Sequence, residues 1–599
     1  MRDSADLFGW TGRLLHVDLN RGRCETRSLA PEVLRAWLGG RGLGGYLLRP
    51  TCTLAWDDPE MPVCICAGPL AGSGSPASGR AHFTSRSPRS PAMGDAPAGG
   101  RLGTQLKRAG WDAVVISGKG ARPCGLEITN QEARIVPTPE LSGLRTGEVF
   151  ARLARFGSVA CVGPAAERGS ALACIAVDRH HAAGRTGLGL SLAVKNLKYL
   201  AVSGSGRVRV ANKAALLRAR GDVIRLTNAS PVLLGQQGLA RFGTAALSDL
   251  MDARRMMPTD NFQRTHFAHA SELNAFALRR RYQPESHGCT GCHVRCGKAA
   301  SGAALPEFDA LSHFTALINN GDLECAVRAN ALCGDLGLDA VASASALACL
   351  RETRGRDFGP GEVEALLEDM GAGHGGPGQD ALAQGTLAQG ADAVAAKAGR
   401  PETAMTVKGL ELGACDPRGA YGLALALAVA TRGGCAQRAA TMSHEILRKP
   451  VATDRFSFSG KARMIKLAED QIAATDSLAV CGYFFFAASL EEYARLYTAV
   501  TGLTGPESTA QGLMRAGERI VRNERTMNAL NGVTAQDDDL PQRFFTQAGT
   551  GGEGIEVPPL DRAAFLEART RYYRIRGLDE TGLPAWENPE EPGAECDDS

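Results

Sequence analysis

Three cysteines stand within eight residues of one another in the stretch "ESHGCTGCHVRCGK", with a C-x2-C-x3-C spacing (Cys289, Cys292 and Cys296). Thiolates at this spacing in a glycine-containing turn can converge on one centre, either zinc or an iron-sulfur cluster. A radical S-adenosylmethionine site uses the reversed order, C-x3-C-x2-C, and fits poorly. The plain alternative is three thiols without a ligand role. The spacing favours a metal centre that needs a fourth ligand.

The fourth ligand must come from elsewhere in the chain. The candidate is Cys481 in "ATDSLAVCGYFFFA". Spacing alone does not choose it over Cys333 or Cys435.

The composition is that of an ordinary globular protein. The chain has 599 residues, of which 44% are hydrophobic and 22% charged, with a net charge of +3 and no long basic block. We therefore expect two to four domains and no nucleic-acid partner. No apolar run approaches the ~20 residues of a membrane span, and the first residues lack a signal-peptide core, so we expect a cytoplasmic protein without membrane contact.

The pattern along the chain changes near residue 207. Before it, short β-branched runs such as "DAVVISG" alternate with glycine-rich turns, which is typical of strands. After it, residues 212–227, 323–337 and 340–354 space apolar residues three and four apart, the helical period. No tandem repeat is evident. We expect residues 368–385 to form a surface loop and the acidic tail 587–599 to be partly disordered.

Landmarks along nearly the whole chain resemble those of the tungsten-dependent aldehyde:ferredoxin oxidoreductases. They include "GWTGRLLHVDL", "SGRAHFTSRSP", "AGGRLGTQLKRAGWDAVVISGKG", "HHAAGRTGLGLSLAVKNLKYLAV", "PEFDAL", "ANALCGDLGLDAV", "CDPRGAYGLALALAVATRGGC" and "GERIVRNERTMNALNG". The resemblance implies an α+β fold, in which an N-terminal domain of two β-sheets (1–207) cradles two pterins and two mainly helical domains follow. The domain at 208–410 would carry the C-x2-C-x3-C, and that at 411–599 the fourth cluster cysteine.

The resemblance also implies the cofactors. These are a tungsten, or molybdenum, bis-pterin and a 4Fe-4S cluster held by Cys289, Cys292, Cys296 and Cys481. Electrons would then leave one at a time to ferredoxin, to another iron-sulfur carrier or to an electron-transfer subunit.

Pterin binding in the family follows a pattern D-x-x-G-L-D/C that occurs twice. We read the first copy in "DLGLDA" (Asp335, Asp339) and the second in "DSLAVC" (Asp476, Cys481). A carboxylate accepts two N–H groups of the pterin edge in one plane, although such an aspartate can also be a helix cap. The remaining cofactor residues implied are Arg80, Arg185, Gly99, Gly100 and Gly187, with Pro97 and Ala183 as backbone carbonyl ligands of a magnesium ion between the pterin phosphates.

The acid-base residues match the family only in part. Glu307 in "LPEFDAL" matches the family glutamate near the metal, but the histidine expected after "RGGC" is Ala436. Alanine relays no proton, and His444 is the nearest imidazole in sequence. The family's E-x-x-H pair, which holds an iron between subunits in some members, has no match, so a homodimer would not form through that iron.

Three functions remain open. The first is oxidation of an aldehyde to a carboxylate, or the reverse, with ferredoxin. The second uses the same cofactors on another substrate, such as an aromatic thioester reduced within a complex. The third is an electron-transfer subunit without substrate chemistry.

Overall fold

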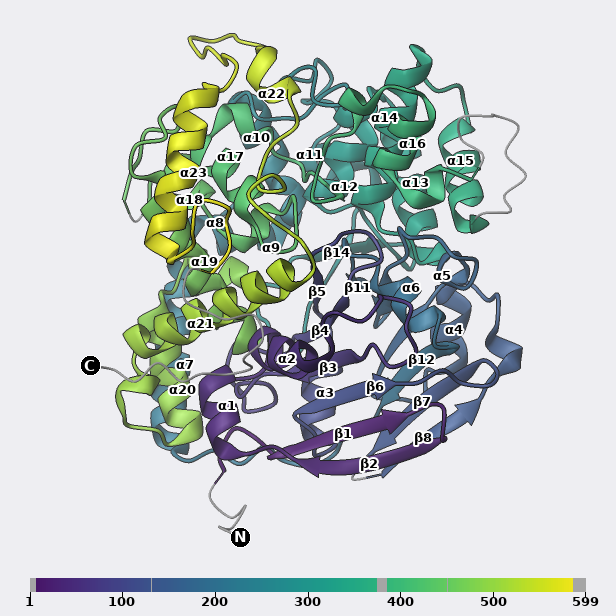
Figure 1. The fold of residues 1–599 in the computed structure, drawn as a ribbon, viewed down its shortest axis with the longest axis vertical. Coiled ribbons are helices and arrows are strands. Elements are labelled where there is room, and N and C mark those ends of the chain that lie inside the picture. Colours follow the sequence, from purple (N-terminus) through teal and green to yellow (C-terminus); the bar gives the residue numbers. More distant parts are fainter. Residues whose placement is uncertain (1–6, 131, 374–384, 450, 585–599) are drawn as a thin grey trace.

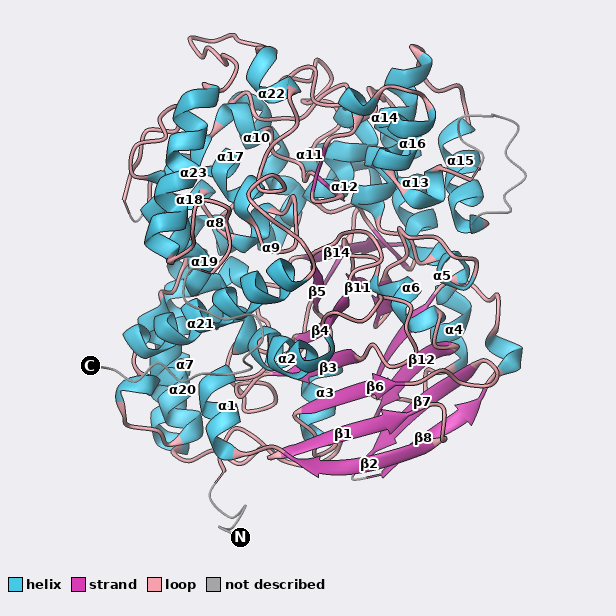
Figure 2. Cartoon of the chain, in the orientation of Figure 1, coloured by secondary structure: helices cyan, strands magenta, loops and turns pink. Residues whose placement is uncertain are grey.

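The computed structural model describes residues 7–130, 132–373, 385–449 and 451–584 (Figure 1). Most of the expected surface loop and all of the acidic tail lie outside these ranges. Strands dominate the first third and helices the rest (Figure 2), which confirms the α+β class. No helix within the described ranges is both long enough and apolar enough to cross a membrane.

The first sheet has six strands in the order β2-β1-β6-β3-β4-β5. Only β1 and β6 pair in parallel, and every other neighbouring pair is antiparallel. The strands are β1 (Arg13–Asp18), β2 (Arg23–Ser28), β3 (Val63–Ala67), β4 (Ala81–Arg86), β5 (Met93–Ala98) and β6 (Ala113–Ser117).

The second sheet repeats this arrangement. Its order is β8-β7-β12-β9-β10-β11, with β7 and β12 parallel and the other pairs antiparallel. The strands are β7 (Cys124–Thr129), β8 (Glu132–Pro137), β9 (Ser158–Val162), β10 (Ile175–Val177), β11 (His181–Ala183) and β12 (Leu197–Val202). The N-terminal region is therefore an internal duplication that is not evident in the sequence.

The two sheets share one hydrophobic core. Ile65 and Ile116 of the first sheet lie in the same cluster as Ile128 and Val202 of the second. Successive strand residues point to opposite faces, so the alternate residues of β3, such as Cys64, pack instead against helices. Both faces of β3 are thus covered, and all five of its residues are buried.

Short helices connect the strands, and longer ones build the remainder. In the N-terminal region they are α1 (Pro31–Trp37), α2 (Gly40–Leu48), α3 (Leu102–Arg108), α4 (Thr146–Arg152), α5 (Pro164–Glu167) and α6 (Leu188–Ala193). The longer helices are α7 (Lys213–Ala229), α11 (Ala275–Tyr282), α13 (Leu323–Leu336), α14 (Ala340–Arg354), α15 (Glu362–Gly371), α16 (Ala391–Lys397), α17 (Tyr421–Val429), α19 (Lys461–Ser477), α20 (Leu490–Thr501), α21 (Ala510–Leu530) and α23 (Arg562–Arg576).

Shorter pieces lie between them. These are α8 (Pro231–Leu234), α9 (Leu239–Phe242), α10 (Ser248–Ala253), α12 (Phe308–Ser312), α18 (Met442–Glu445), α22 (Arg543–Thr546), β13 (Glu285–His287), β14 (Gly297–Ala300), β15 (Ala303–Ala304), β16 (Thr406–Val407) and β17 (Leu410–Glu411). The three helices expected from apolar spacing are present as α7, α13 and α14. Asn212, Asp322 and Asp339 cap their N-termini.

Helices from distant parts of the chain pack together. Leu216 and Val223 of α7 share a hydrophobic cluster with Tyr493 and Tyr497 of α20. A second cluster unites α13 and α14 with α17 and α23. The two helical regions therefore share hydrophobic clusters, with α13, α14, α17 and α23 drawn above the sheets and α7 and α20 beside them (Figure 1). The boundary at 410 stays a prediction.

Candidate functional site

The clustered cysteines lie on the loop of the antiparallel hairpin β13–β14. The backbone N–H of Cys292 donates to the Cys289 carbonyl (3.1 Å), and that of Thr290 to the Gly100 carbonyl (3.1 Å). A Cβ atom at Gly99 would lie 2.8 Å from the sulfur of Cys289. The glycines after β5 thus let that strand end directly against the cysteine loop.

Cys481 lies beside the same loop. Its backbone N–H donates to the Ala77 carbonyl (3.0 Å), which fixes it at the end of α19. Burial raises the pKa of each loop thiol, and the neighbouring Cys481 sulfur raises it further, for Cys292 to about 11. Arg80 donates to the Cys481 sulfur from Nη1 at 3.6 Å. Four thiols and a guanidinium therefore meet at one place.

The other two candidates for the fourth ligand have different neighbours. Cys333 is buried in the hydrophobic core around α13. Cys435 is also buried, and its sulfur accepts from Nη2 of Arg432 at 2.8 Å. The arrangement thus supports Cys481 as the fourth ligand.

Zinc fits this arrangement less well than a cluster does. Within the part of the chain that the structure describes, no three His, Cys, Asp or Glu side chains converge on a single metal ion. Zinc–sulfur bonds of about 2.3 Å require such convergence. A four-iron cluster takes one thiolate at each iron, so its ligands stand further apart.

Asp476, in the second pterin motif, is surrounded by cationic side chains. Its Oδ2 lies 3.4 Å from Nη1 of both Arg41 and Arg438, and its Oδ1 lies 3.8 Å from the His82 ring. Burial would raise the pKa of this carboxyl, but these neighbours outweigh it and hold the pKa near 2. Asp476 is therefore a carboxylate at neutral pH, as a pterin acceptor must be.

A buried network extends from Asp476. Arg438 also pairs with Asp95, and Arg432 donates to the Asp95 carbonyl at 2.6 Å. Arg41 makes a bidentate pair with Glu524 (2.6 and 2.7 Å). Three arginines and three carboxylates are thus buried together, and burying so many charges is costly in a protein interior unless each is paired and hydrogen-bonded.

Several buried polar atoms around this network lack a hydrogen-bond partner. They are Nε of Arg80, Arg185, Arg432 and Arg438, the hydroxyls of Thr84, Thr186 and Thr441, and both ring nitrogens of His82. Buried polar atoms are almost always hydrogen-bonded in native proteins. Phosphates and sulfur anions of a bis-pterin would supply these acceptors, so the donor set fits that cofactor.

Arg185 and Gly187 form the turn between β11 and α6. Both have left-handed backbone conformations, with φ of 79° and 73°. The backbone N–H of Arg185 donates to Asp339 Oδ2 (2.7 Å), whereas Asp339 Oδ1 caps α14 by accepting from Ala342 (2.7 Å). Both oxygens of Asp339 are thus used by the protein, and its role here is that of a helix cap.

The two pterin motifs differ by one residue in register. Each copy contains one residue with a left-handed backbone, which is Ala479 in the second copy (φ 61°) and Gly337 in the first (φ 74°). When these two residues are aligned, Asp476, three residues before Ala479, corresponds to Gly334. Asp335 then corresponds to Ser477.

Neighbouring contacts support this register. The hydroxyl of Ser477 accepts from the Gly42 backbone N–H (2.9 Å), and Asp335 Oδ1 is the nearest atom, at 3.2 Å, to a Cβ built on Gly147. Both therefore turn toward an N-terminal helix, α2 or α4. A Cβ on Gly334 would meet no atom within 4 Å. The first copy thus presents Gly334, and not the expected Asp335, at the place of Asp476.

Pro97 and Ala183 lie on equivalent strands of the two sheets. Pro97 belongs to β5 and Ala183 to β11, and these outermost strands contact each other. Gly100, with φ of 100°, follows β5 and packs against Asp178 and the cysteine loop. The carbonyl pair expected for magnesium thus lies where the duplicated halves meet.

Glu307 stands immediately before α12. Its side chain makes no capping bond and keeps accessible surface. Burial and the nearby Asp309 carboxylate nevertheless raise the pKa of Glu307, while Arg80 lowers it. Glu307 thus combines accessible surface with a desolvated carboxyl, and it lies within the electrostatic influence of the Arg80 that contacts Cys481.

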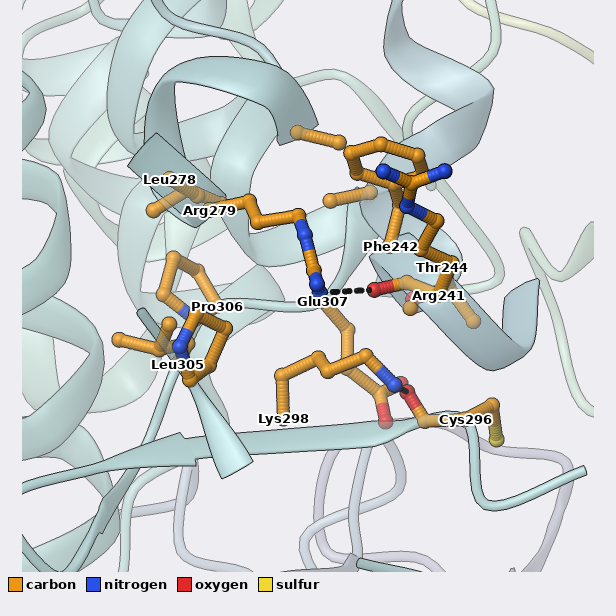
Figure 3. A pocket seen from close by; sticks show the side chains of 14 residues that line it. Arg241, Phe242, Thr244, Leu278, Arg279, Cys296, Lys298, Leu305, Pro306 and Glu307 are labelled. Atoms are coloured by element: carbon orange, nitrogen blue, oxygen red, sulfur yellow. Dashed lines mark hydrogen bonds between the residues drawn. The ribbon is translucent and has the colours of Figure 1, made fainter. Parts of the chain in front are cut away.

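A small pocket of about 20 Å³ adjoins Glu307 and Cys296. Its other walls include Phe242, Arg241 and Arg279 (Figure 3). This volume holds roughly one water molecule. The pocket therefore brings a water-sized space to the carboxyl and to the cluster loop.

His444 does not join the site. It lies on the short helix α18, and its Nδ1 is 3.1 Å from the Val451 carbonyl at the protein surface. Ala436 is partly buried against the helical core. The structure therefore gives no support to His444 as a substitute for the histidine lost at Ala436.

Sequence reasoning overlooked several residues of the site. The motifs do not identify the following residues of the buried network: Arg41, His82, Asp95, Arg432 and Arg438. The signal for some was present, since Arg41 lies in "GGRGLGG" and Arg432 in "RGGC". An arginine among glycines is a local hint that backbone and guanidinium approach a common ligand.

The fold and the site together indicate a class, an oxidoreductase, because two duplicated sheets bring buried arginines close to three loop cysteines and Cys481. Residues 14–204 match the aldehyde ferredoxin oxidoreductase N-terminal domain, and residues 220–593 match aldehyde ferredoxin oxidoreductase domains 2 and 3. The chain belongs to the aldehyde ferredoxin oxidoreductase family. That family carries a tungsten bis-pterin and a 4Fe-4S cluster.

Three known proteins are similar to this chain. The tungsten-containing aldehyde ferredoxin oxidoreductase of Pyrococcus furiosus is 33% identical over 98% of this chain and 99% of its own. The WOR-like subunit of aliphatic sulfonate oxidoreductase from the same organism is 25% identical, over 98% of this chain and 97% of its own. The solved active site complex BamBC of benzoyl coenzyme A reductase shares the fold, with a TM-score of 0.81, 18% identity and 96% coverage of both chains.

Proposed function

We propose that this chain oxidises an aldehyde to a carboxylate and passes the electrons to ferredoxin. The observation that carries the proposal is the meeting of Cys289, Cys292, Cys296 and Cys481 close to Arg80, with Glu307 within the electrostatic influence of Arg80. The four thiolates would hold the 4Fe-4S cluster. Arg80, Arg185, Asp476 and the buried arginines around Asp476 would hold the pterins.

The reaction balances with water as oxygen donor and two carriers as acceptors. RCHO, H₂O and two oxidised ferredoxins give RCOO⁻, three protons and two reduced ferredoxins. A tungsten bis-pterin and a 4Fe-4S cluster bound here would supply the two-electron redox chemistry and the one-electron transfer to the carrier. Glu307 is placed to accept a proton from water, and its raised pKa suits a base that must also release that proton.

Arg80 would link the two redox groups. Its guanidinium contacts the Cys481 sulfur and keeps a buried Nε without a partner. A fixed charge between cluster and pterin would hold both in place and stabilise their anionic states.

The test combines metal analysis with turnover. Anaerobically purified protein should contain four irons, one tungsten or molybdenum and two pterins per chain, and should reduce a viologen dye when given a simple aldehyde. Cofactor-loaded protein that reduces no dye with any of a panel of aliphatic and aromatic aldehydes would contradict the proposal.

Ala436 favours a second candidate, the same chemistry on a different substrate. Where the family has histidine, alanine leaves room for a bulkier molecule and removes a proton relay. The variant Ala436→His separates the two functions. Activity on simple aldehydes should rise or hold if the chain is an aldehyde oxidoreductase, whereas the extra ring should block the reaction of a bulkier substrate.

We also propose a cytoplasmic location and a monomer or a homodimer formed without a shared iron. Each cysteine in the described ranges is free. Reduced thiols are characteristic of the cytosol, and an oxygen-sensitive cluster suits that compartment.

A further inference from the structure

The cysteine loop itself forms part of the protein surface. Gly288, Gly291 and Arg295 on the loop are exposed, and the three cysteines between them are partly accessible. The proposed cluster would thus lie directly beneath this loop. The shortest path for an electron from the proposed cluster to the protein surface therefore passes through this loop.

Five exposed arginines, which we call the arginine ring, surround the loop. They come from different segments: Arg179 (before β11), Arg220 (α7), Arg241 (α9), Arg279 (α11) and Arg295 (the loop itself). Arg295 donates from Nη2 to the Ser286 carbonyl at 2.6 Å, across the hairpin.

Contacts tie the other four to the loop. Arg241 and Arg279 line the pocket that reaches Cys296, and both guanidinium groups lie over the Phe242 ring, at 5.4 and 5.7 Å (Figure 3). Helix α7, which carries Arg220, packs in the same hydrophobic cluster as Val294 of the loop. Arg179 directly precedes His180, whose ring lies 4.6 Å from that of His287 on β13.

The positive charge of the ring is not balanced locally. In the described part of the chain none of the five forms an ion pair, and two acids near the ring pair with other arginines. Asp178 pairs with Arg101 at 3.3 Å, and Glu324 with Arg328 at 3.1 Å. The exposed acids near the ring include Glu285 on β13, Asp335 near Arg179, and Glu307 in the pocket wall, and the five arginines outnumber them. The ring therefore keeps a net positive potential over the loop.

An apolar side chain lies among these charges. Phe276 on α11 is 45% exposed, and its ring is 4.5 Å from that of Phe242. A partly exposed aromatic residue within a rim of arginines is the composition of a protein-docking site. Arginines with free donors also form bidentate pairs with carboxylates.

We propose that the arginine ring is the docking site of an acidic one-electron carrier protein, with its carboxylates on the arginines and its redox group facing the loop. This rests on the proposed function, because the cluster must supply the electron. One electron passes from the reduced cluster to one oxidised carrier at each encounter. Complementary charge speeds such encounters by 10-fold or more at low salt.

The test is the charge-reversed double variant Arg179→Glu/Arg220→Glu of the holoenzyme, which leaves the pocket and the loop untouched. A purified bacterial 2[4Fe-4S] ferredoxin and methyl viologen are compared as acceptors. We expect the KM for ferredoxin to rise about tenfold at low salt and to lose its salt dependence. Iron content and viologen-linked turnover should stay unchanged.

Arg574→Glu is the matched control, since Arg574 is exposed on α23 and forms no ion pair within the described ranges. An unchanged ferredoxin KM and salt dependence in the double variant, with viologen turnover intact, would overturn the docking site and leave the function standing.

A binding measurement distinguishes failure of the docking-site proposal from failure of the proposed function. If wild-type protein showed no viologen-linked turnover, the function would fall, and calorimetric titration with the same ferredoxin would judge the docking site alone. Equal affinity of the double variant and Arg574→Glu would overturn it. Binding of a short DNA duplex without binding of ferredoxin would overturn it as well.

Discussion

At the scale of single residues, the site depends on where each thiol and carboxylate stands in the backbone. Cys481 and Asp339 occupy equivalent positions after α19 and α13, yet one joins the cysteine loop and the other caps a helix. Asp476 and Gly334 are likewise equivalent, and only one carries a carboxylate. Equivalent positions have thus taken different chemical roles.

The first prediction concerns Cys481. Cys481→Ala should lower iron below four per chain and bleach the brown cluster absorbance, because three thiolates hold a cluster less firmly. Cys333→Ala, which removes a buried thiol of the helical core, should keep all four irons. Iron analysis and absorbance measure both, and the reverse pattern would contradict the assignment.

The second prediction concerns the pterin carboxylates. Asp476→Asn should lower bound pterin, since it removes a charged acceptor worth about 1.5–3 kcal/mol. Gly334→Asp should fold, because its Cβ meets no atom within 4 Å, and should retain pterin longer in mild denaturant. Pterin released over time is quantified by its fluorescence after oxidation; faster loss in Gly334→Asp would refute the register.

The third prediction concerns Glu307. Glu307→Gln should lower kcat about 100-fold with metal and iron content unchanged, because a positioned base is lost. The raised pKa of Glu307 means that the carboxylate form appears only above its ordinary titration range. Wild-type kcat/KM should therefore rise with pH through that pKa, and this limb should be missing in the variant.

At the scale of elements, each β-sheet supports the turn that ends one helix. A Cβ at Gly68, after β3, would lie 2.4 Å from the Leu478 carbonyl, and one at Gly163, after β9, would lie 2.2 Å from the Leu336 carbonyl. Both glycines bring a strand end against a helix end. The two turns that carry the pterin motifs are thus held by equivalent contacts.

The fourth prediction tests this contact. Gly163→Ala should destabilise the protein by about 1–3 kcal/mol, because the methyl group must displace the backbone. Gly221→Ala, in the middle of α7 with no atom within 4 Å of the new Cβ, should instead stabilise by about 0.5–1 kcal/mol. Urea unfolding followed by circular dichroism compares them; equal midpoints would refute the packing argument.

The sequence predicts elements whose signals are local. Helices α13 and α14 follow from apolar spacing and capping aspartates, and the cysteine loop follows from its spacing. Pairing between distant residues leaves no such signal, as with Arg41 and Asp476, which are 435 positions apart. The alignment of Asp335 with Asp476 failed for a similar reason, because the correct alignment of the two motifs depends on the left-handed backbone at Gly337, which the sequence does not show.

At the scale of the whole molecule, a buried carboxylate ties the helical regions together. Asp538 lies 2.6 Å from both Lys408, between β16 and β17, and Arg525 on α21, and it accepts from the Tyr573 hydroxyl of α23 at 2.8 Å. Burial would raise the pKa of Asp538, but its two cations hold it near 2. Its charge is therefore part of the folded state.

The fifth prediction follows from that lowered pKa. Asp538→Asn should destabilise the protein by about 3–5 kcal/mol at pH 7, since two buried cations lose their partner. An unfolded aspartate titrates near 3.9, so the contribution is complete above that pH and disappears as pH falls toward 2. The difference in stability between wild type and variant should therefore disappear over this pH range, as measured by thermal unfolding.

The neighbouring Asp539→Asn is the control. Asp539 pairs with Arg562 at 2.5 Å near the surface, where such a bridge contributes about 0–1 kcal/mol. If Asp539→Asn lost as much stability as Asp538→Asn, the burial of Asp538 would not explain its larger contribution.

The two halves of the duplicated structure differ in the residues that could carry electrons away from the centre. A scaffold with two equivalent halves would let electrons leave the centre equally on either side. Here Cys481 follows α19, whereas Asp339, which caps α14, stands at the equivalent position after α13. Under the proposed assignment, electrons therefore leave only through the half that contains α19. The half that contains Gly334 has a buried thiol at Cys333, but it has no thiol at the position equivalent to Cys481, where Asp339 stands.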